Sequence, residues 1–249
     1  MARQLRMATN SDYGQFLNDL RQALTGELAN YNFSHCCCAV PGIVRRPSGV
    51  GVSFGNLPWQ NVPIRDDLSQ ILGPAVKVLV ENDANLAGLS EALLVQKKYK
   101  KVLYLTISTG IGDGIITNGV IDADLADSEA GHTMLEHNGQ MLKWEDFASG
   151  RALVKKYGKK AADITDPRVW AQFAKNIAQG LDGLLSTLQP DVVIIGGGVG
   201  SHFPKYEQFL KTELAKLENK MVHIPPVLQA KRPELAVIYG CYDFIRQNL

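Results

Sequence analysis

Hydrophobic residues recur along the chain with two different spacings, and each spacing predicts a different kind of element. Between Ser11 and about Tyr31 they fall every three or four residues, which predicts an amphipathic helix with Ser11 as its N-cap. The same spacing predicts the longest helix over residues 166–188 and further helices at 81–96, from 144 onward, at 204–218 and at 234–247. Short apolar runs predict strands at residues 36–40, 50–54, 76–80, 101–108, 115–117 and 192–195, and another short strand at 3–8.

Strands and helices alternate over most of the chain, which predicts an α/β fold with mostly parallel sheets. Residues 121–143 show neither spacing, so we expect an irregular segment there. A chain of 249 residues suffices for one large domain or for two small lobes that share a cleft.

Charge and composition argue against several classes of function. The 26 basic and 25 acidic residues leave a net charge of +1 without a basic stripe, so a nucleic-acid or membrane-surface role has no electrostatic support. The N-terminal residues lack the apolar core of a signal peptide, and no apolar stretch approaches the roughly 20 residues of a membrane span. We therefore expect a cytoplasmic protein that binds neither nucleic acid nor a membrane.

The four cysteines, Cys36, Cys37, Cys38 and Cys241, do not suit a disulfide framework. Three consecutive cysteines cannot pair with one another at normal disulfide geometry. Because they lie in an apolar run, we interpret them as small buried strand residues in a reducing compartment rather than as metal ligands.

The run Glu81-Asn82-Asp83-Ala84-Asn85 follows a buried strand and opens a helix. Ligands of open α/β sheets bind outside the carboxyl ends of the strands, so this position favours a binding site. Asp83 could accept the proton of a sugar hydroxyl, and the Asn82 amide could fix the direction of that hydroxyl. Helix capping explains the same residues equally well.

Two glycine-rich segments also follow buried strands. In Thr109-Gly110-Ile111-Gly112-Asp113-Gly114 and in Gly196-Gly197-Gly198, backbone N–H groups could approach phosphate oxygens. A tight hairpin is the alternative for the first segment, and a carboxylate at Asp113 would repel a phosphate. The second segment is not a dinucleotide fingerprint, because no acidic residue follows at the usual spacing.

Further polar residues cluster in the run Glu129-Ala130-Gly131-His132 and at Glu145. Together they could surround a polyhydroxylated ligand. The alternatives are a structural role for His132 and favourable placement of Glu145 in the first turn of a helix.

Taken in order, these segments resemble the ROK family of sugar kinases and sugar-responsive regulators, over nearly the whole chain. The matching stretches are Ala39-Val40-Pro41-Gly42-Ile43-Val44, Asn56-Leu57-Pro58-Trp59, Val80-Glu81-Asn82-Asp83-Ala84-Asn85, the loop at residues 109–114, Glu129-Ala130-Gly131-His132, Phe147-Ala148-Ser149-Gly150 and Ile195-Gly196-Gly197-Gly198.

The resemblance implies an actin-like ATPase (ribonuclease H-like) fold, with two lobes that close over ATP and a hexose. The N-terminal lobe would comprise residues 1–105 with about 236–249, and the C-terminal lobe residues 106–235. The resemblance also implies that Asp83 is the general base of a glucokinase-like transferase that uses ATP with Mg²⁺, and that the protein is a homodimer. It assigns sugar contacts to Gly42, Asn56, Asn82, Glu129, His132 and Glu145, and nucleotide contacts to Thr109, Gly110, Gly112, Gly196, Gly197 and Gly198.

The chain departs from the family at three places. It has no Asp-x-Gly-Gly-Thr loop, so the N-terminal lobe is expected to lack its first β-hairpin and to expose strand edges, which a partner chain or a rearranged N-terminus would cover. The stretch at residues 133–143 has no cysteine, so no structural zinc is expected, and we interpret His137 as exposed. Asp113 stands where the family usually has a small neutral residue.

These departures leave alternatives to an ATP-dependent kinase. A sugar-binding sensor without transfer activity would need no phosphate loop, and polyphosphate could replace ATP as the phosphoryl donor. A DNA-binding repressor is less favoured, because there is no room for a helix-turn-helix before Ser11.

Overall fold

The computed structural model describes residues 3–249. The chain forms two compact units: unit 1 comprises Met1–Asp83 together with Ile245–Leu249, and unit 2 comprises Ala84–Phe244. The chain leaves unit 1 in the first turn of α3 (Asp83–Val95) and returns to it near the end of α9 (Ala236–Gln247). The predicted lobes, with a boundary between residues 105 and 106, stay a prediction.

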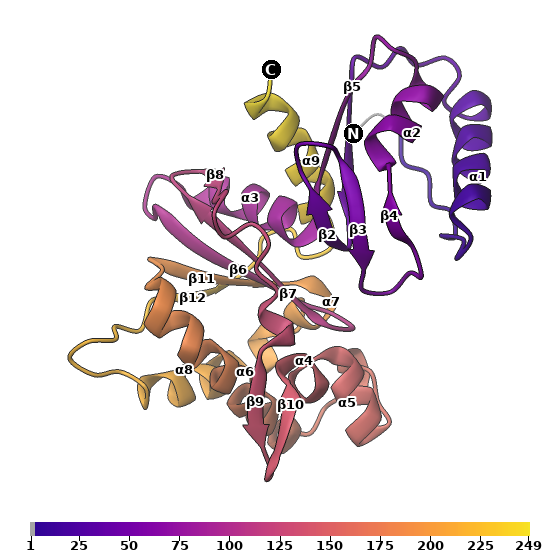
Figure 1. Cartoon of the computed structure of the whole chain (residues 1–249). Helices are drawn as coiled ribbons and strands as arrows, with labels where there is room; N and C mark the ends of the chain where they lie inside the picture. The colour runs from indigo at the N-terminus through magenta and orange to yellow at the C-terminus, as the bar shows by residue number, and fades with distance from the viewer. Residues whose placement is uncertain (1–2) are drawn as a thin grey trace. The chain divides into compact units, whose positions relative to one another are not determined.

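Unit 1 is built from two small sheets and two helices (Figure 1). Its elements are α1 (Tyr13–Gly26), β1 (His35–Val40), β2 (Gly42–Arg45), β3 (Val50–Phe54), β4 (Gln60–Val62), α2 (Ile64–Leu72) and β5 (Lys77–Asn82). Strands β1 and β5 pair in parallel, and β2, β3 and β4 form an antiparallel sheet. The buried side chains of Val40, Val80, Trp59 and Leu68 belong to one core cluster of this unit.

Four sequence predictions for unit 1 need correction. Residues 3–10 form no strand and add none to the β1–β5 pair, so the predicted covering of exposed edges stays a prediction. The N-cap of α1 is Asp12 rather than Ser11, because the Asp12 carboxylate accepts a hydrogen bond of 2.8 Å from the Gln15 N–H. The helix ends at Gly26, and the three consecutive cysteines of β1 are half-buried rather than buried.

Unit 2 contains a five-stranded sheet in the order β12-β11-β6-β7-β8. Its strands are β6 (Lys101–Ile107), β7 (Ile111–Thr117), β8 (Val120–Ile121), β11 (Val192–Gly196) and β12 (Val227–Gln229), beside a separate hairpin of β9 (Met134–His137) and β10 (Gln140–Lys143). Strands β12, β11 and β6 run parallel, whereas β7 and β8 are antiparallel neighbours. The five-stranded sheet is therefore mixed, and antiparallel pairs outnumber parallel pairs among the described strands, so the prediction of mostly parallel sheets is wrong.

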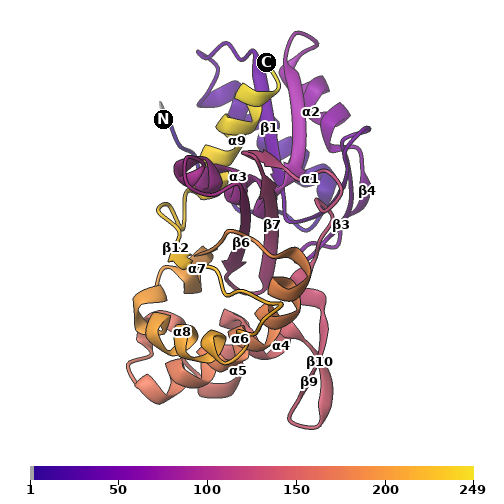
Figure 2. The same ribbon diagram turned by 90° about the vertical axis from the view of Figure 1, so that its left-hand side faces the viewer.

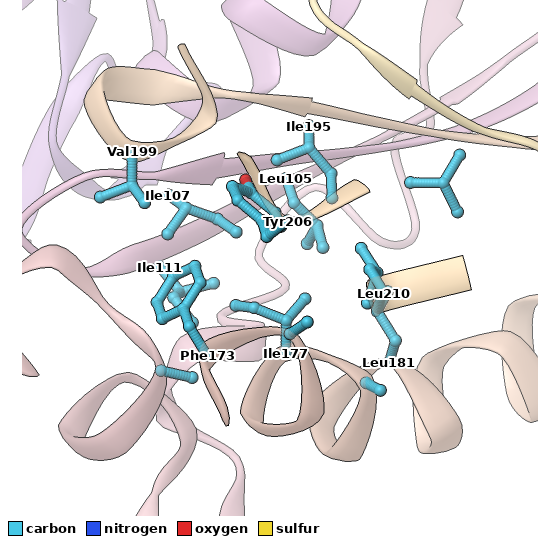
Figure 3. Packing of buried hydrophobic residues seen from close by; sticks show 14 of the residues in the cluster. Leu105, Ile107, Ile111, Phe173, Ile177, Leu181, Ile195, Val199, Tyr206 and Leu210 are labelled. Carbon is cyan, nitrogen blue, oxygen red and sulfur yellow. The ribbon is translucent and has the colours of Figure 1, made fainter. Parts of the chain in front are cut away.

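Helices cover both faces of this sheet (Figure 1). The helices of unit 2 after α3 are η1 (Ala130–His132), α4 (Trp144–Ala148), α5 (Gly150–Tyr157), η2 (Ala161–Asp163), α6 (Pro167–Leu188), α7 (Gly197–Gly200), η3 (Phe203–Lys205), α8 (Glu207–Ala215) and most of α9. Figure 3 shows Phe173, Ile177 and Leu181 of α6 turned toward the strands. Because strand side chains alternate between faces, Leu105 and Ile195 join α6 and α8, while Tyr104 and Ile194 join α3 and α9.

Residues 122–129 are irregular as predicted, but η1 and the β9–β10 hairpin form within residues 130–143. Asn138 and Gly139 have φ angles of 53° and 81°, which suits the two-residue turn that joins antiparallel strands. Figure 2 shows this hairpin projecting from unit 2 beside α4. No helix within residues 3–249 combines the length and the apolar character needed to cross a membrane.

Candidate active site

The junction of β5 and α3 presents the predicted base. Asp83 is the first residue of α3 and directly follows β5, so it lies at the carboxyl end of a parallel strand pair. The Asn82 side chain donates a hydrogen bond of 3.1 Å to the Gly42 carbonyl at the start of β2. A Cβ built on Gly42 would collide with the Ser53 carbonyl oxygen, so β2 can approach β3 here only with glycine.

A partly buried ion pair supports this junction, with Glu81 as its buried member. Arg46 donates from Nε and from Nη2 to the two carboxylate oxygens of Glu81, both at 2.8 Å. The Asn82 N–H donates to the same carboxylate at 2.7 Å. The Glu81 side chain is only 3% exposed, so these partners rather than water surround its carboxylate. Arg46 was missed by the sequence analysis, since nothing in the turn between β2 and β3 indicates a partner 35 residues away.

A second cluster, in unit 2, is centred on Glu145 of α4. Its carboxylate accepts hydrogen bonds from the Ile111 N–H at 3.3 Å and from Arg151 at 3.0 Å, and it lies 3.9 Å from Nε2 of His132. The Glu145 side chain is half-buried, whereas the His132 side chain is exposed. The structure thus brings two of the predicted sugar contacts together. The sequence analysis did not identify Arg151, which is the second residue of the next helix, α5 (Gly150–Tyr157).

Asp113 lies inside unit 2, not beside the glycine loop as an obstacle to phosphate. It is 3% exposed, and its Oδ1 accepts a hydrogen bond of 2.7 Å from the Ala130 N–H. Burial raises the pKa of the Asp113 carboxyl, although the Ser128 side chain and the Ala130 N–H oppose that rise. The interpretation that Asp113 repels a phosphate fails because its side chain is directed to residues 128–130 in the interior.

The segment that begins with Glu129 is half-buried at its start and exposed at His132. The His132 N–H donates to the Glu129 carbonyl at 2.9 Å, which closes the short helix η1. A Cβ built on Gly131 would collide with the Ile111 carbonyl oxygen, so this segment packs closely on the beginning of β7. Asn56, the remaining predicted sugar contact, lies exposed in the loop between β3 and β4.

The two glycine segments lie at the carboxyl ends of β6 and β11, which are neighbouring parallel strands within the five-stranded sheet. The turn after β6 contains the exposed Thr109 and is closed by a hydrogen bond of 2.9 Å from the Ser108 N–H to the Gly110 carbonyl. Gly196 ends the neighbouring parallel strand β11, where it lies opposite Thr106. Gly197 follows with a φ angle of 81°, and Gly198 is exposed. Gly112 lies within β7 rather than in the turn, also opposite Thr106.

His137 is not simply exposed, as the sequence interpretation had it. Its ring stacks on Phe147 of α4, with centroids 4.1 Å apart and an angle of 8° between the planes. This contact attaches the β9–β10 hairpin to the helix that carries Glu145. Within residues 3–249, no group of three or more His, Cys, Asp or Glu side chains is arranged to hold a metal ion.

Comparison with known proteins decides the family. The model of the ROK family matches residues 1–248. The chain belongs to the ROK family. A glucokinase of Thermotoga maritima is 30% identical over 202 residues, covering 64% of this chain and 62% of that protein. A xylose repressor of Caldicellulosiruptor bescii is 26% identical over 253 residues, covering 84% of this chain and 62% of the repressor.

This ROK chain therefore aligns with less than two thirds of the length of both curated relatives. A solved structure covers more of it. The ROK family glucokinase from Streptomyces griseus, in complex with glucose and AMPPNP, has a TM-score of 0.81 at 23% identity and covers 97% of this chain and 90% of that chain. The chain has the actin-like ATPase fold of the ROK sugar kinases, which confirms the predicted fold class.

Proposed function

We propose that this ROK chain takes part in ATP-dependent phosphorylation of a hexose, with Asp83 as the general base. The observation that carries the proposal is the position of Asp83 at the carboxyl end of β5, next to Asn82, whose N–H and side chain are both hydrogen-bonded. Because the backbone at this junction is fixed, the Asp83 carboxylate is already positioned to accept a proton from a bound hydroxyl.

The proposed reaction forms one bond and breaks one. The Asp83 carboxylate accepts the proton of the reacting sugar hydroxyl as that oxygen attacks the γ-phosphorus of ATP. The bond between the γ-phosphorus and the bridging oxygen breaks, and ADP leaves with the electron pair. The products are the sugar phosphate, ADP and the proton, which Asp83 returns to water.

The family resemblance supplies the residues that we propose for sugar recognition. We assign hydroxyl contacts to Gly42, Asn56 and Asn82 of unit 1 and to Glu129, His132 and Glu145 of unit 2. Carboxylate, amide and imidazole groups suit a hexose, because each hydroxyl offers one donor and can accept in return. The cluster of Glu145 and His132 supports this assignment most directly.

The donor nucleotide would bind at the carboxyl ends of β6 and β11 in the five-stranded sheet. There Thr109, Gly110, Gly112, Gly196, Gly197 and Gly198 would let the backbone approach the phosphates and adenosine closely. Mg²⁺ would arrive with ATP as part of the substrate and would neutralise phosphate charge. The described residues offer no ready-made metal cluster, so we assign no step to a protein-held metal.

The test is an Asp83→Asn variant in a coupled assay of ADP release, with hexose binding measured by isothermal titration. We expect turnover to fall by about 10²–10⁴-fold, because general base catalysis is lost, while the hexose dissociation constant changes little. Asp67→Asn is the matched control: this aspartate of α2 accepts a hydrogen bond from Tyr13 of α1, and its loss should leave turnover unchanged. If the Asp83→Asn variant turned over as fast as wild type, Asp83 would be excluded as the base.

A sugar-binding protein without transfer activity is the second candidate, since the relatives include xylose repressors. Hexose binding with no ADP release from wild-type protein would favour it. Transfer of a phosphoryl group to the hexose from polyphosphate but not from ATP, with the shortened polyphosphate as leaving group, would point to the other donor. We also propose a homodimer, which light scattering of the purified chain tests directly.

A further inference from the structure

Asp113 is a buried carboxylate that the proposed reaction does not use. One of its oxygens accepts from the Ala130 N–H, and the other, Oδ2, is buried without a well-formed hydrogen bond. The Ser128 side chain favours the charged form of this carboxyl but does not form a regular hydrogen bond to Oδ2. Such a group is costly to bury, so its presence calls for a compensating role.

We propose that Asp113 is a positioning residue that fixes the segment Glu129-Ala130-Gly131-His132 on β7 and thereby sets the affinity for the hexose. This inference rests on the proposed function. It adds a residue that positions the sugar contacts without being one of the sugar or nucleotide contacts. Asp113 itself would touch neither sugar nor nucleotide.

The hydrogen bonding of the segment shows why one acceptor matters. Within it, the His132 N–H donates to the Glu129 carbonyl and the Thr133 N–H donates to the Ala130 carbonyl. The N–H of Ala130, a buried residue, donates to Asp113 instead of to the backbone. Loss of the carboxylate would leave this N–H buried and unsatisfied, and the segment would have to move to reach water.

Strand β7, which carries Asp113, also holds Glu145 in place. Ile111, two residues before Asp113, donates its N–H to Glu145, and its carbonyl lies against Gly131. Alternate residues of β7 therefore anchor Glu145 and the segment that carries Glu129 and His132. A displacement at Asp113 would change the distances among these three side chains while leaving the turn after β6 in place.

The test compares Asp113→Ala with Asp113→Asn. Alanine removes the acceptor, so we expect the hexose dissociation constant and the KM for hexose to rise by about tenfold, as for loss of one buried hydrogen bond. The KM for ATP should change by less than about twofold. Asparagine keeps an acceptor for the Ala130 N–H and should restore hexose affinity to within about threefold of wild type.

Glu91→Ala is the matched control. Glu91 is also a buried carboxylate of unit 2, and it accepts the N–H groups of Lys231 and Arg232 at 2.7 and 2.8 Å, before α9. Its loss should lower the melting temperature at least as much as Asp113→Ala without changing hexose affinity. An equal loss of affinity in the control would show that Asp113 acts only through general stability, and would overturn the inference.

Hydrogen–deuterium exchange separates this inference from the proposed function. In Asp113→Ala the peptide covering residues 126–134 should exchange at least about tenfold faster than in wild type, with Asp113→Asn close to wild type. If wild-type protein binds no hexose, the proposed function fails, and the exchange result still shows whether Asp113 holds the segment. Unchanged exchange in Asp113→Ala, or unchanged hexose affinity in a wild type that binds hexose, would refute the positioning role.

Discussion

Glu81 in unit 1 and Asp113 in unit 2 are both buried carboxylates, and each supports a neighbouring set of the proposed site residues by a different physical means. Glu81 has a bidentate guanidinium partner and also accepts the Asn82 N–H. Asp113 has one backbone N–H and a second oxygen without a well-formed hydrogen bond. Their exposed fractions, 2% and 3%, are nearly equal, so burial does not explain the difference.

The comparison shows that a buried carboxylate can stabilise one region of the protein and destabilise another. A buried charge with a complete set of partners is costly to break, because removal of one partner leaves the other charge uncompensated. A buried carboxylate with an incomplete set favours its neutral form, and its replacement by a neutral isostere costs the fold little. Stability should therefore depend on the Arg46–Glu81 pair, and hexose affinity on Asp113.

Arg46→Met should give the largest loss. It leaves the Glu81 carboxylate buried without its cation, and we expect the free energy of unfolding to fall by about 2–4 kcal/mol, since Arg46 is itself partly exposed. Urea denaturation measures this loss. The double variant Arg46→Met/Glu81→Gln should recover part of it, because the uncompensated charge is then gone. A single variant as stable as wild type would mean that the pair does not support the β5–α3 junction.

Gly131→Ala should give an intermediate loss, because the added Cβ would meet the Ile111 carbonyl oxygen. Overpacking of this kind costs about 1–3 kcal/mol of unfolding free energy. Gly183→Ala on α6 is the control, since its Cβ would lie in open space, and it should stabilise the protein by about 0.5–1 kcal/mol. Thermal unfolding of both variants decides the point, and equal melting temperatures would contradict the close approach of η1 to β7.

Asp113→Asn should have the smallest effect on stability, and that effect should depend on pH. Because the folded-state pKa of Asp113 is raised, the folded protein binds this proton more tightly than the unfolded chain does. Its contribution to stability is present below the ordinary carboxyl pKa of about 4 and is lost as pH rises through the raised value. The asparagine variant cannot titrate there, so it should gain relative to wild type as pH rises. Parallel stability curves from pH 4 to 7 would show that Asp113 does not titrate as we infer.

Much of the fold could be predicted from the hydrophobic pattern. The strand over residues 36–40, the strand and helix around Asp83 and the long helix over 166–188 all form near their predicted positions. Two turn signals were overlooked: Asn118-Gly119 and Asn138-Gly139 each have positive φ at both positions and join antiparallel strands. Residues 3–8, with the sequence Arg-Gln-Leu-Arg-Met-Ala, were misjudged because an alternating segment becomes a strand only where another strand is available to pair with it.

The sequence analysis named candidate site residues but not the residues that support them. Glu145 and His132 stand out in the sequence by residue type and order, and the structure places them together. Arg46, Arg151 and Asp113 could not be assigned in the same way, since each acts through a hydrogen-bond partner distant in the sequence or on another element.

The sequence by itself determined the family, the alternation of strands and helices and the order of polar residues at the strand ends, because these depend on local spacing along the chain. Only the tertiary structure decided that Glu81 has a cation and that Asp113 points into the interior toward Ala130. Burial and hydrogen-bond satisfaction depend on what other elements bring near a side chain, and no local pattern in the sequence encodes that.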